Sequence, residues 1–414
     1  MEMTSKENYK EERTHFYNGL TTPFWADLDN VEYATLNVHA LSPTKLTAIQ
    51  DAILAITPVF KRTAELVRLL PDEMLLQLGY PKETLGYLRL QKNVMENVIG
   101  RFDVMFDGDT PKIIEFNADT PTFIKELFSI TGELSTHFGV PNINKTEEKI
   151  LKSYMEKAID GAVLDSGKTA PSILFVANQP SKEDYLTIQY LADLVDCPFA
   201  PIEELEIIPG VGLFHEGRKV DILYRQTWAM EIIAQEVNPK GEKIGEELIE
   251  LIEQNLLEVI NPPASFLLQN KMLLALMWQL TEEDNPVYTP EMKEAIKRYI
   301  PKSYFFEEDM ENTDTPYIQK PIFGREGNSV TLLTGKEVLV TAPEKDFERM
   351  PQLCQEYVPS YITTIETNDG IKTGNLVFGA FVLGLEHPSA IGARFTAGEG
   401  ITGNNALFVA VTSE

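Results

Sequence analysis

Apolar side chains recur at helical spacing in the first part of the chain and at strand spacing in the last part. Over residues 43–99 they fall at steps of three and four, which is the pattern of helices with one buried face. A second helical stretch is predicted over about 122–160. From Thr315 onward, short apolar runs are separated by Gly, Asn, Asp and Pro, which is typical of short strands joined by turns.

The middle of the chain contains two strand-loop-helix units. The apolar runs at 172–177 and 221–226 predict strands, and helix-like stretches follow them at 182–195 and up to about residue 236. Such units are typical of parallel α/β sheets. Further helices are predicted over 271–280 and 290–300. The predicted fold class is therefore mixed α/β, of the α+β kind.

The character of the chain changes near residues 160 and 262, so we predict three regions. Residues 1–160 form a helical region with one hairpin, 161–262 form an α/β subdomain, and 263–414 form a strand-rich region. A chain of 414 residues is long enough for two or three domains with sizeable cores. No internal repeat is evident in the sequence.

Composition and charge exclude several classes of protein. The chain has 36 Lys and Arg against 63 Asp and Glu, a net charge of −27. Nucleic-acid binding requires clustered positive charge, so no nucleic-acid partner is expected. Two cysteines, Cys197 and Cys354, are too few for a disulfide framework. The polar N-terminus and the lack of a run of about 18 apolar residues predict no signal peptide, no membrane helix and a cytoplasmic location.

A β-hairpin is predicted around the turn-rich segment Asp-Gly-Asp-Thr-Pro, which begins at residue 107. Alternating polar and apolar residues flank this turn on both sides. If the hairpin is symmetric about Asp109, Asp103 lies opposite Glu115 and Arg101 lies opposite Asn117. All four side chains then project from one face of the hairpin.

Facing carboxylates repel each other in a sheet, so Asp103 and Glu115 require a cation between them. Oxygen atoms of Asp, Glu and Asn suit Mg²⁺, which often binds substrate phosphates as well. The hairpin is therefore a candidate magnesium site. A solvated hairpin with ordinary surface acids would explain the same pattern.

A second candidate is the Gly-rich connection that follows Lys320. Gly324 and Gly327 permit positive φ and close backbone approach, as a phosphate-binding loop requires. Lys320 could supply charge to a phosphate. Neither GxGxxG nor GxxxxGK[ST] occurs, so a Rossmann site and a P-loop are not supported. The alternative is a turn with a purely structural role.

Four other positions have candidate roles. The segment 355–358 ends a predicted strand and could border an adenine ring, or it could be an edge strand. Lys271 begins a helix, where positive charge opposes the helix dipole, and a functional role or a solvated lysine would explain it. Arg394 ends a strand before a Gly-rich loop and could clamp a phosphate, or it could form a surface ion pair. Glu231 follows Trp228 and could face a site, or it could belong to an amphipathic helix start with Trp228 in the core. The five histidines lack zinc-ligand spacing.

These segments together resemble the glutathionylspermidine synthase family, an ATP-grasp group of carbon–nitrogen ligases. The shared order is Arg-Phe-Asp, Glu-x-Asn-Ala-Asp, Asn-Lys, Lys-Pro-x-x-Gly-Arg-Glu-Gly, Gln-Glu and Ile-Gly-x-Arg, and it spans roughly residues 15–411. The resemblance implies an ATP-grasp-like fold with the nucleotide-binding part in the C-terminal region. The chain resembles members that lack the additional amidase domain, and it lacks the acidic pair that often follows the late arginine.

The resemblance also implies a role for each candidate residue. Its catalytic residues would be Arg101 and Arg394. Its magnesium ligands would be Asp103, Glu115 and Asn117. Its ATP-binding residues would be Lys271, Lys320, Gly324, Gly327, Asn328, Gln355, Glu356, Tyr357, Val358 and Arg394. Its substrate would lie near Thr120 and Thr122, with Glu231 as a further candidate.

The implied function is an ATP- and Mg²⁺-dependent ligase that forms an amide through an acyl phosphate. Its partners would be a small or peptide-like carboxylate and an amine, with a polyamine as one candidate. Two other hypotheses fit the same residues. One is a nucleotide-binding protein that retains the fold without turnover, and the other is a structural metal-binding protein.

Overall fold

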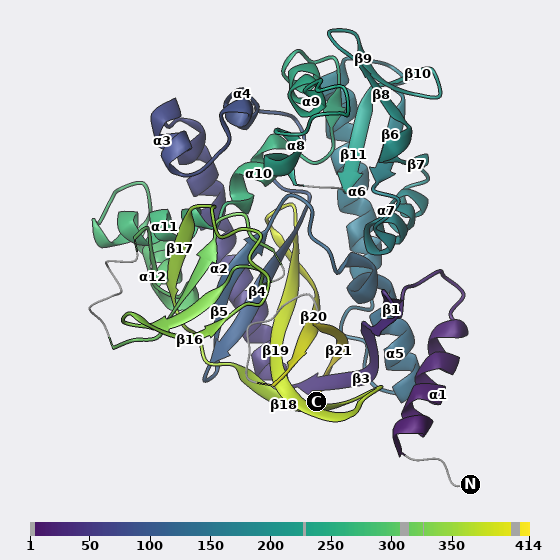
Figure 1. Cartoon of the computed structure of the whole chain (residues 1–414), viewed down its shortest axis with the longest axis vertical. Helices are drawn as coiled ribbons and strands as arrows, with labels where there is room; N and C mark the ends of the chain where they lie inside the picture. The colour runs from purple at the N-terminus through teal and green to yellow at the C-terminus, as the bar shows by residue number, and fades with distance from the viewer. Residues whose placement is uncertain (1–4, 227–228, 307–313, 326, 399–405) are drawn as a thin grey trace.

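The computed structural model describes residues 5–226, 229–306, 314–325, 327–398 and 406–414, whose strands form five sheets (Figure 1). The largest sheet has seven strands in the order β3-β21-β20-β19-β4-β5, with β18 paired to β19. Its strands are β3 (Ala34–Leu41), β4 (Ile99–Asp107), β5 (Thr110–Asn117), β18 (Tyr361–Thr367), β19 (Gly370–Leu383), β20 (His387–Ala397) and β21 (Leu407–Ser413). All pairings in this sheet are antiparallel except that of β21 with β3.

Helix α2 (Pro43–Arg68) covers one face of the large sheet. Its N-terminus is capped by Ser42, whose hydroxyl accepts a hydrogen bond from a backbone N–H of the first turn. On the buried side of the helix, Phe60 packs against Phe102 and Phe116, with ring centroids 5.4 and 4.9 Å away. Because side chains alternate along a strand, the polar residues of the β4–β5 hairpin project from the opposite face.

A parallel four-stranded sheet, in the order β12-β11-β6-β7, forms the α/β part of the molecule (Figure 1). Its strands are β6 (Ile173–Ala177), β7 (Phe199–Pro201), β11 (Ile222–Gln226) and β12 (Glu258–Val259). Helices α6 (Glu147–Ser166) and α7 (Lys182–Leu194) pack against it. The apolar runs of β6 and β11 are buried almost throughout, as expected of strands covered on both faces.

A five-stranded antiparallel sheet, in the order β13-β17-β14-β15-β16, forms the third unit. Its strands are β13 (Ser303–Tyr304), β14 (Tyr317–Pro321), β15 (Thr331–Thr334), β16 (Glu337–Thr341) and β17 (Gln352–Glu356). Helices α11 (Met272–Glu282) and α12 (Pro290–Tyr299) lie beside it (Figure 1). All of these elements lie in the region predicted for 263–414.

The remaining described elements are small. Strands β1 (Asp27–Leu28) and β2 (Val31–Glu32) form one hairpin, and β8 (Leu205–Ile208), β9 (Gly212–His215) and β10 (Arg218–Val220) form a three-stranded sheet. The other α-helices are α1 (Ser5–Asn18), α3 (Asp72–Gln77), α4 (Leu85–Leu88), α5 (Thr131–Phe138), α8 (Met230–Ile233), α9 (Ile244–Glu253) and α10 (Pro263–Gln269). Short 3₁₀ turns occupy η1 (Lys82–Thr84) and η3 (Ile202–Glu204), and a π-helical turn occupies η2 (Glu126–Ile130). Within the described part of the chain, no helix is long and apolar enough to cross a membrane.

The structure corrects three predicted helical stretches. The 43–99 stretch is not continuous, because prolines at 71 and 81 separate α2, α3 and the turns around α4, and no regular element occupies 89–98. The 122–160 stretch is interrupted after Gly139, which adopts a left-handed conformation that ends α5. The helix expected up to about residue 236 is only α8.

The seven-stranded sheet takes strands from both the 1–160 and the 263–414 regions. The parallel sheet, in contrast, lies wholly within 161–262. The division of the chain at residues 160 and 262 stays a prediction.

Candidate active site

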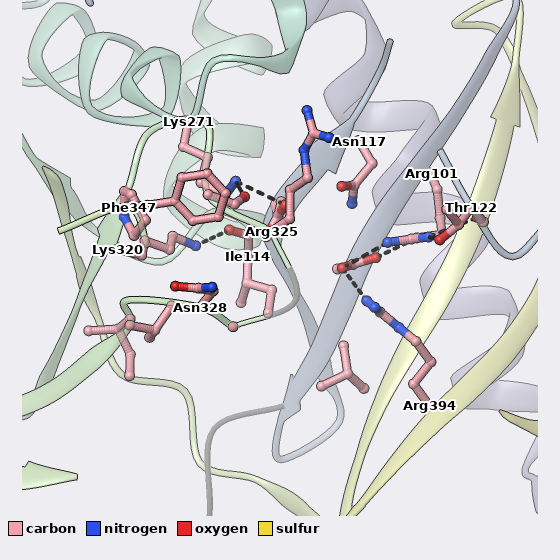
Figure 2. Close-up of a pocket in the computed structure, with 18 of the residues that line it drawn as sticks. Arg101, Ile114, Asn117, Thr122, Lys271, Lys320, Arg325, Asn328, Phe347 and Arg394 are labelled. Atoms are coloured by element: carbon pink, nitrogen blue, oxygen red, sulfur yellow. Dashed lines mark hydrogen bonds and ion pairs between the residues drawn. The ribbon is translucent and has the colours of Figure 1, made fainter. Parts of the chain in front are cut away.

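One cavity of about 880 Å³ lies where the β4–β5 hairpin, strands β19 and β20, and the five-stranded sheet meet. Of the residues predicted for the site, all except Glu231 line this cavity. They come from segments almost 300 residues apart in sequence. Figure 2 shows Lys271 and Lys320 on one side of the cavity and Arg101 and Arg394 on the other. The lining residues from the predicted set are Arg101, Asp103, Glu115, Asn117, Thr120, Thr122, Lys271, Lys320, Gly324, Gly327, Asn328, Gln355, Glu356, Tyr357, Val358 and Arg394.

The predicted register of the hairpin is confirmed. Asp103 pairs with Glu115, and Arg101 pairs with Asn117. The turn is centred between residues 108 and 109, half a residue from the predicted axis, and a β-bulge at Ile114 restores the predicted pairing beyond it. The backbone carbonyl of Ile114 accepts a hydrogen bond from Lys320 Nζ at 2.6 Å.

Asp103 is held between two arginines. Arg101 Nε donates to Asp103 Oδ1 at 2.8 Å, and Arg394 Nη2 from strand β20 donates to Asp103 Oδ2 at 2.5 Å (Figure 2). Burial alone would raise the pKa of Asp103, but the two guanidinium groups outweigh burial and hold the pKa below its ordinary value. Asp103 is therefore ionised, and its charge is compensated within the protein.

Glu115 is compensated by a lysine from another element. Lys271, which caps the start of α11, places its Nζ 3.1 Å from Glu115 Oε1. With its side-chain amide oriented to satisfy both neighbours, Asn117 donates to Glu115 Oε1 and accepts from Arg101 Nη2, each at 3.2 Å. The cation required beside the facing carboxylates is thus supplied by protein side chains in this structure.

Lys320 is buried and bonded to neutral groups. Its Nζ donates to the Ile114 carbonyl and to Gln355 Oε1, the latter at 2.9 Å. Burial is the main cause that lowers the pKa of Lys320 from 10.5 to about 8, since it disfavours the charged form. Nearby Glu115 opposes this shift and Lys271 adds to it. Lys320 therefore carries charge that is available to an anion at neutral pH.

The connection between β14 and β15 forms one side of the cavity. A Cβ at Gly324 would lie 2.3 Å from Pro321 Cγ, and Gly327 has a φ of 70°, so both positions require glycine. The Gly324 carbonyl accepts a hydrogen bond from Lys271 Nζ at 2.7 Å. The left-handed conformation allowed by glycine is present at Gly327 but not at Gly324, and contact of this connection with phosphate stays a prediction.

Glu231 is buried and does not line the cavity, but it bonds to Arg325, which does. Its Oε1 accepts from Arg325 Nη2 at 2.8 Å. Burial raises the pKa of Glu231, and the Arg325 guanidinium opposes that shift. Trp228, from the same predicted motif, lies outside the described residues.

The end of strand β17 borders an apolar part of the cavity. Glu356, Tyr357 and Val358 line it together with apolar side chains of the neighbouring strands, among them Ile318 and Leu332. Such a mixture of apolar walls and polar backbone is typical of small-molecule sites. A role in holding adenine stays a prediction for this segment.

Thr120 and Thr122 lie just past the hairpin, where the chain bends sharply. The Thr122 carbonyl accepts a hydrogen bond from Arg101 Nη1 at 2.8 Å. The next residue, Phe123, is buried with a φ of 81°, which is unusual for a bulky residue and marks a constrained segment. Before the bend, Asp119 forms a buried ion pair with Arg225 of strand β11.

Sequence reasoning missed several residues that line the cavity. Arg325 stands inside the Gly-Arg-Glu-Gly motif, and Asp346 and Phe347 lie in the connection between β16 and β17. Four polar residues around the start of α7 also line it: Asn178, Ser181, Glu183 and Asp184. They follow the carboxyl end of parallel strand β6, and ligands of α/β proteins commonly bind at such ends. Their position after a predicted parallel strand was the sequence feature that could have identified them.

No group of three or more His, Cys, Asp or Glu side chains in the described residues is arranged to hold a metal ion. The predicted magnesium set contains two carboxylates and one amide, which are the oxygen donors that Mg²⁺ prefers. All three residues line the cavity. The donor chemistry therefore fits the metal, although Asp103 and Glu115 are bonded to Arg and Lys side chains in this structure.

Comparison with known proteins identifies the family. The model for the family described as "Glutathionylspermidine synthase preATP-grasp" matches residues 4–413. The chain belongs to this family. A Haemophilus influenzae protein named "Putative acid--amine ligase" is similar to this family member, with 26% identity over 260 residues. That match covers 60% of each chain, less than two thirds of the relative's length.

A solved structure supports the fold of this glutathionylspermidine synthase family member. It is a glutathione synthetase-like effector from Globodera pallida in its apo form. The two structures superpose with a TM-score of 0.62 at 13% identity, covering 100% of this chain and 98% of the other. At this identity the likeness concerns the fold alone, and it confirms the predicted mixed α/β, ATP-grasp-like class.

Proposed function

We propose that this chain is an ATP- and Mg²⁺-dependent carbon–nitrogen ligase that joins a small or peptide-like carboxylate to an amine through an acyl phosphate. The observation that carries the proposal is the cavity itself. Within about 880 Å³ it gathers cationic side chains, oxygen donors suited to magnesium, and apolar side chains such as Ile318 and Leu332. The amine is open in identity, and a polyamine is one candidate.

In the proposed reaction, a carboxylate oxygen of the acid bonds to the γ-phosphorus of ATP as the bond to ADP breaks. The amine nitrogen then bonds to the acyl carbon, phosphate leaves, and the nitrogen loses a proton. Both steps move negative charge between oxygen atoms. Lys271, Lys320 and Arg394, which line the cavity, would stabilise that charge, and Arg101 would lie beside the carboxylate.

Asp103, Glu115 and Asn117 would hold the magnesium ion, which would neutralise phosphate charge when bound. These residues now bond to Arg101, Arg394 and Lys271. Since a carboxylate oxygen that binds a metal gives up protein partners, metal binding would leave guanidinium N–H groups available to an anion.

The family assignment and the name of the Haemophilus influenzae relative support acid–amine ligation. Thr120 and Thr122 would lie near the carboxylate substrate, since both line the cavity next to Arg101. Glu231 would act on the substrate end through Arg325. The alternative, a protein that binds nucleotide without turnover, predicts ATP affinity with no product formation.

The test is a coupled ADP-release screen over panels of carboxylates and amines. Release that requires both an acid and an amine supports ligation. Arg101→Ala and Asp103→Asn should lower that rate, and Arg62→Ala, at an exposed ion pair outside the cavity, serves as the matched control. If no pair raises ADP release above background, the proposed function is wrong. If both site variants match the wild type on every pair, the proposed site is wrong.

A further inference from the structure

Two connections of the five-stranded sheet are joined by a set of reciprocal hydrogen bonds. One is the β14–β15 connection, with Asn328 and Ser329, and the other is the β16–β17 connection, with Asp346 and Phe347. Asn328 Nδ2 donates to Asp346 Oδ2 at 2.7 Å, and the Asp346 backbone N–H donates back to Asn328 Oδ1 at 3.0 Å. The Phe347 N–H donates to Ser329 Oγ at 2.9 Å.

The protein therefore uses both acceptor positions of the Asn328 side-chain oxygen and one of the two N–H donors of the same amide. The second hydrogen bond to this oxygen comes from Ser329 Oγ at 2.9 Å. The residue is 7% exposed, although it lines the cavity. A nucleotide group that donated to the amide oxygen would have to displace existing partners. The role of Asn328 as a direct ATP ligand stays a prediction, and the contacts of this residue also support an indirect role.

The local backbone also needs this support. Gly327 and Ser329 have φ values of 70° and 60°, and the left-handed region is unfavourable for a serine. Such conformations persist where surrounding contacts fix them. The Ser329 hydroxyl and backbone N–H both bond within this set, the latter to the Glu344 carbonyl at 2.9 Å.

We propose that Asn328 and Asp346 are positioning residues that hold the two connections as one unit over the phosphate end of the cavity. Figure 2 places Asn328 and Phe347 on the same side of the cavity as Lys320 and Lys271. The pair acts on the nucleotide only through the backbone it fixes. The inference rests on the proposed function for its kinetic consequence, and its structural consequence is independent of that function.

The test exchanges the two side chains. Asn328→Asp places two carboxylates at hydrogen-bond distance and should separate the connections. Asp346→Asn alone keeps an oxygen that can accept from Asn328 and should have a smaller effect. The double exchange, Asn328→Asp with Asp346→Asn, restores a donor and an acceptor with the same geometry. Asn285→Asp is the matched control, since its side chain caps a turn outside the cavity.

Two measurements are made on each full-length variant. In hydrogen–deuterium exchange without ligand, Asn328→Asp should speed exchange in peptides covering both connections, and the double exchange should reverse this. In ADP release, Asn328→Asp should raise KM for ATP by about fivefold or more, and the double exchange should bring it to within about twofold of wild type. The control should match wild type in both.

Two results would overturn the inference. One is a higher KM for Asn328→Asp with wild-type exchange in both connections, which would make Asn328 a direct nucleotide ligand. The other is a double variant as impaired as the single one. Absence of ADP release by the wild type would refute the proposed function instead, and the exchange measurement would still test the pair.

Discussion

The two sides of the cavity compensate charge in different ways. On one side, which we call the arginine wall, Arg101 and Arg394 both bond to the ionised Asp103 (Figure 2). On the other, the lysine wall, Lys320 is buried against a backbone carbonyl and an amide oxygen, and Lys271 is shared between Glu115 and a carbonyl. The arginine wall is therefore held by formal charges, whereas Lys320 is held by neutral dipoles.

This difference predicts different roles for the two walls. Removal of a charge from the arginine wall leaves a buried carboxylate with less compensation, which is costly. Removal of the charge of Lys320 relieves a desolvation cost, although it also removes two hydrogen bonds. The arginine wall should therefore matter for stability, and the lysine wall should matter mainly for binding.

The largest predicted effect is the loss of stability in Arg101→Ala. Its guanidinium and Asp103 are both buried, so the variant should lose about 3–5 kcal/mol in the free energy of unfolding. Chemical denaturation measures this value. Arg101→Lys keeps the charge but not the paired geometry and should lose less. An Arg101→Ala variant as stable as the wild type would show that Asp103 is not held as described.

Lys320→Met should weaken nucleotide binding about tenfold to a hundredfold, because a charge-assisted contact to phosphate is lost. Its stability should change by less than about 1 kcal/mol, since relief of desolvation offsets the lost hydrogen bonds. Calorimetric titration and denaturation give the two values. Equal losses of stability in Lys320→Met and Arg101→Ala would show that the two walls do not differ in their contribution to the free energy of unfolding.

Alkaline pH should weaken nucleotide binding through Lys320. Its pKa is lowered to about 8 by burial, so it loses its proton as pH rises through about 8. Affinity should then fall by up to about tenfold per pH unit above this value. Lys320→Arg, which stays charged, should show a flat profile over the same range. A sloping profile in that variant would assign the titration to another group.

The same shift fixes the sign of the stability change. Between about pH 8 and 10.5 the unfolded chain binds more protons at Lys320 than the folded chain, so this group makes stability rise with pH. Asp103 acts in the acid range instead. Because its pKa is lowered in the folded protein, it stabilises the fold at pH values above the ordinary aspartate pKa, and this stabilisation is lost as the pH falls into the acid range.

The smallest predicted effect belongs to Glu231→Gln. Arg325 is about one-third exposed, so the loss of its partner should change nucleotide affinity by less than about threefold. Titration of the variant with the same nucleotide checks this value. A change of tenfold or more would place Glu231 closer to the chemistry than its contact with Arg325 indicates.

The hairpin and the face shared by its polar residues could be predicted from the sequence because they depend on period-two alternation and turn chemistry. The predicted pairing of Asp103 with Glu115 is present, but it depends on the bulge at Ile114, which offsets the half-residue difference in the turn axis. That bulge could not be predicted, since it leaves no mark in the residue pattern. The partners of Asp103 and Glu115 could not be predicted either, because tertiary packing brings Arg394 and Lys271 to them.

Helix ends and distant cavity residues were the weakest predictions. The helical period continues through Pro71 and Pro81 in the sequence, although the chain bends at both. Asp346 carries no motif, and only the folded connections show that it meets Asn328. Residues at the start of α7 reach the cavity by tertiary packing, which local patterns do not encode.

The central claim is that the two walls form one Mg–ATP site. Calorimetric titration with a nonhydrolysable ATP analogue, with and without Mg²⁺, tests it most directly. We predict one site per chain whose affinity falls in Lys320→Met at any magnesium concentration, and whose magnesium dependence is lost in Asp103→Asn. No saturable binding by the wild type, or wild-type behaviour in both variants, would contradict the account.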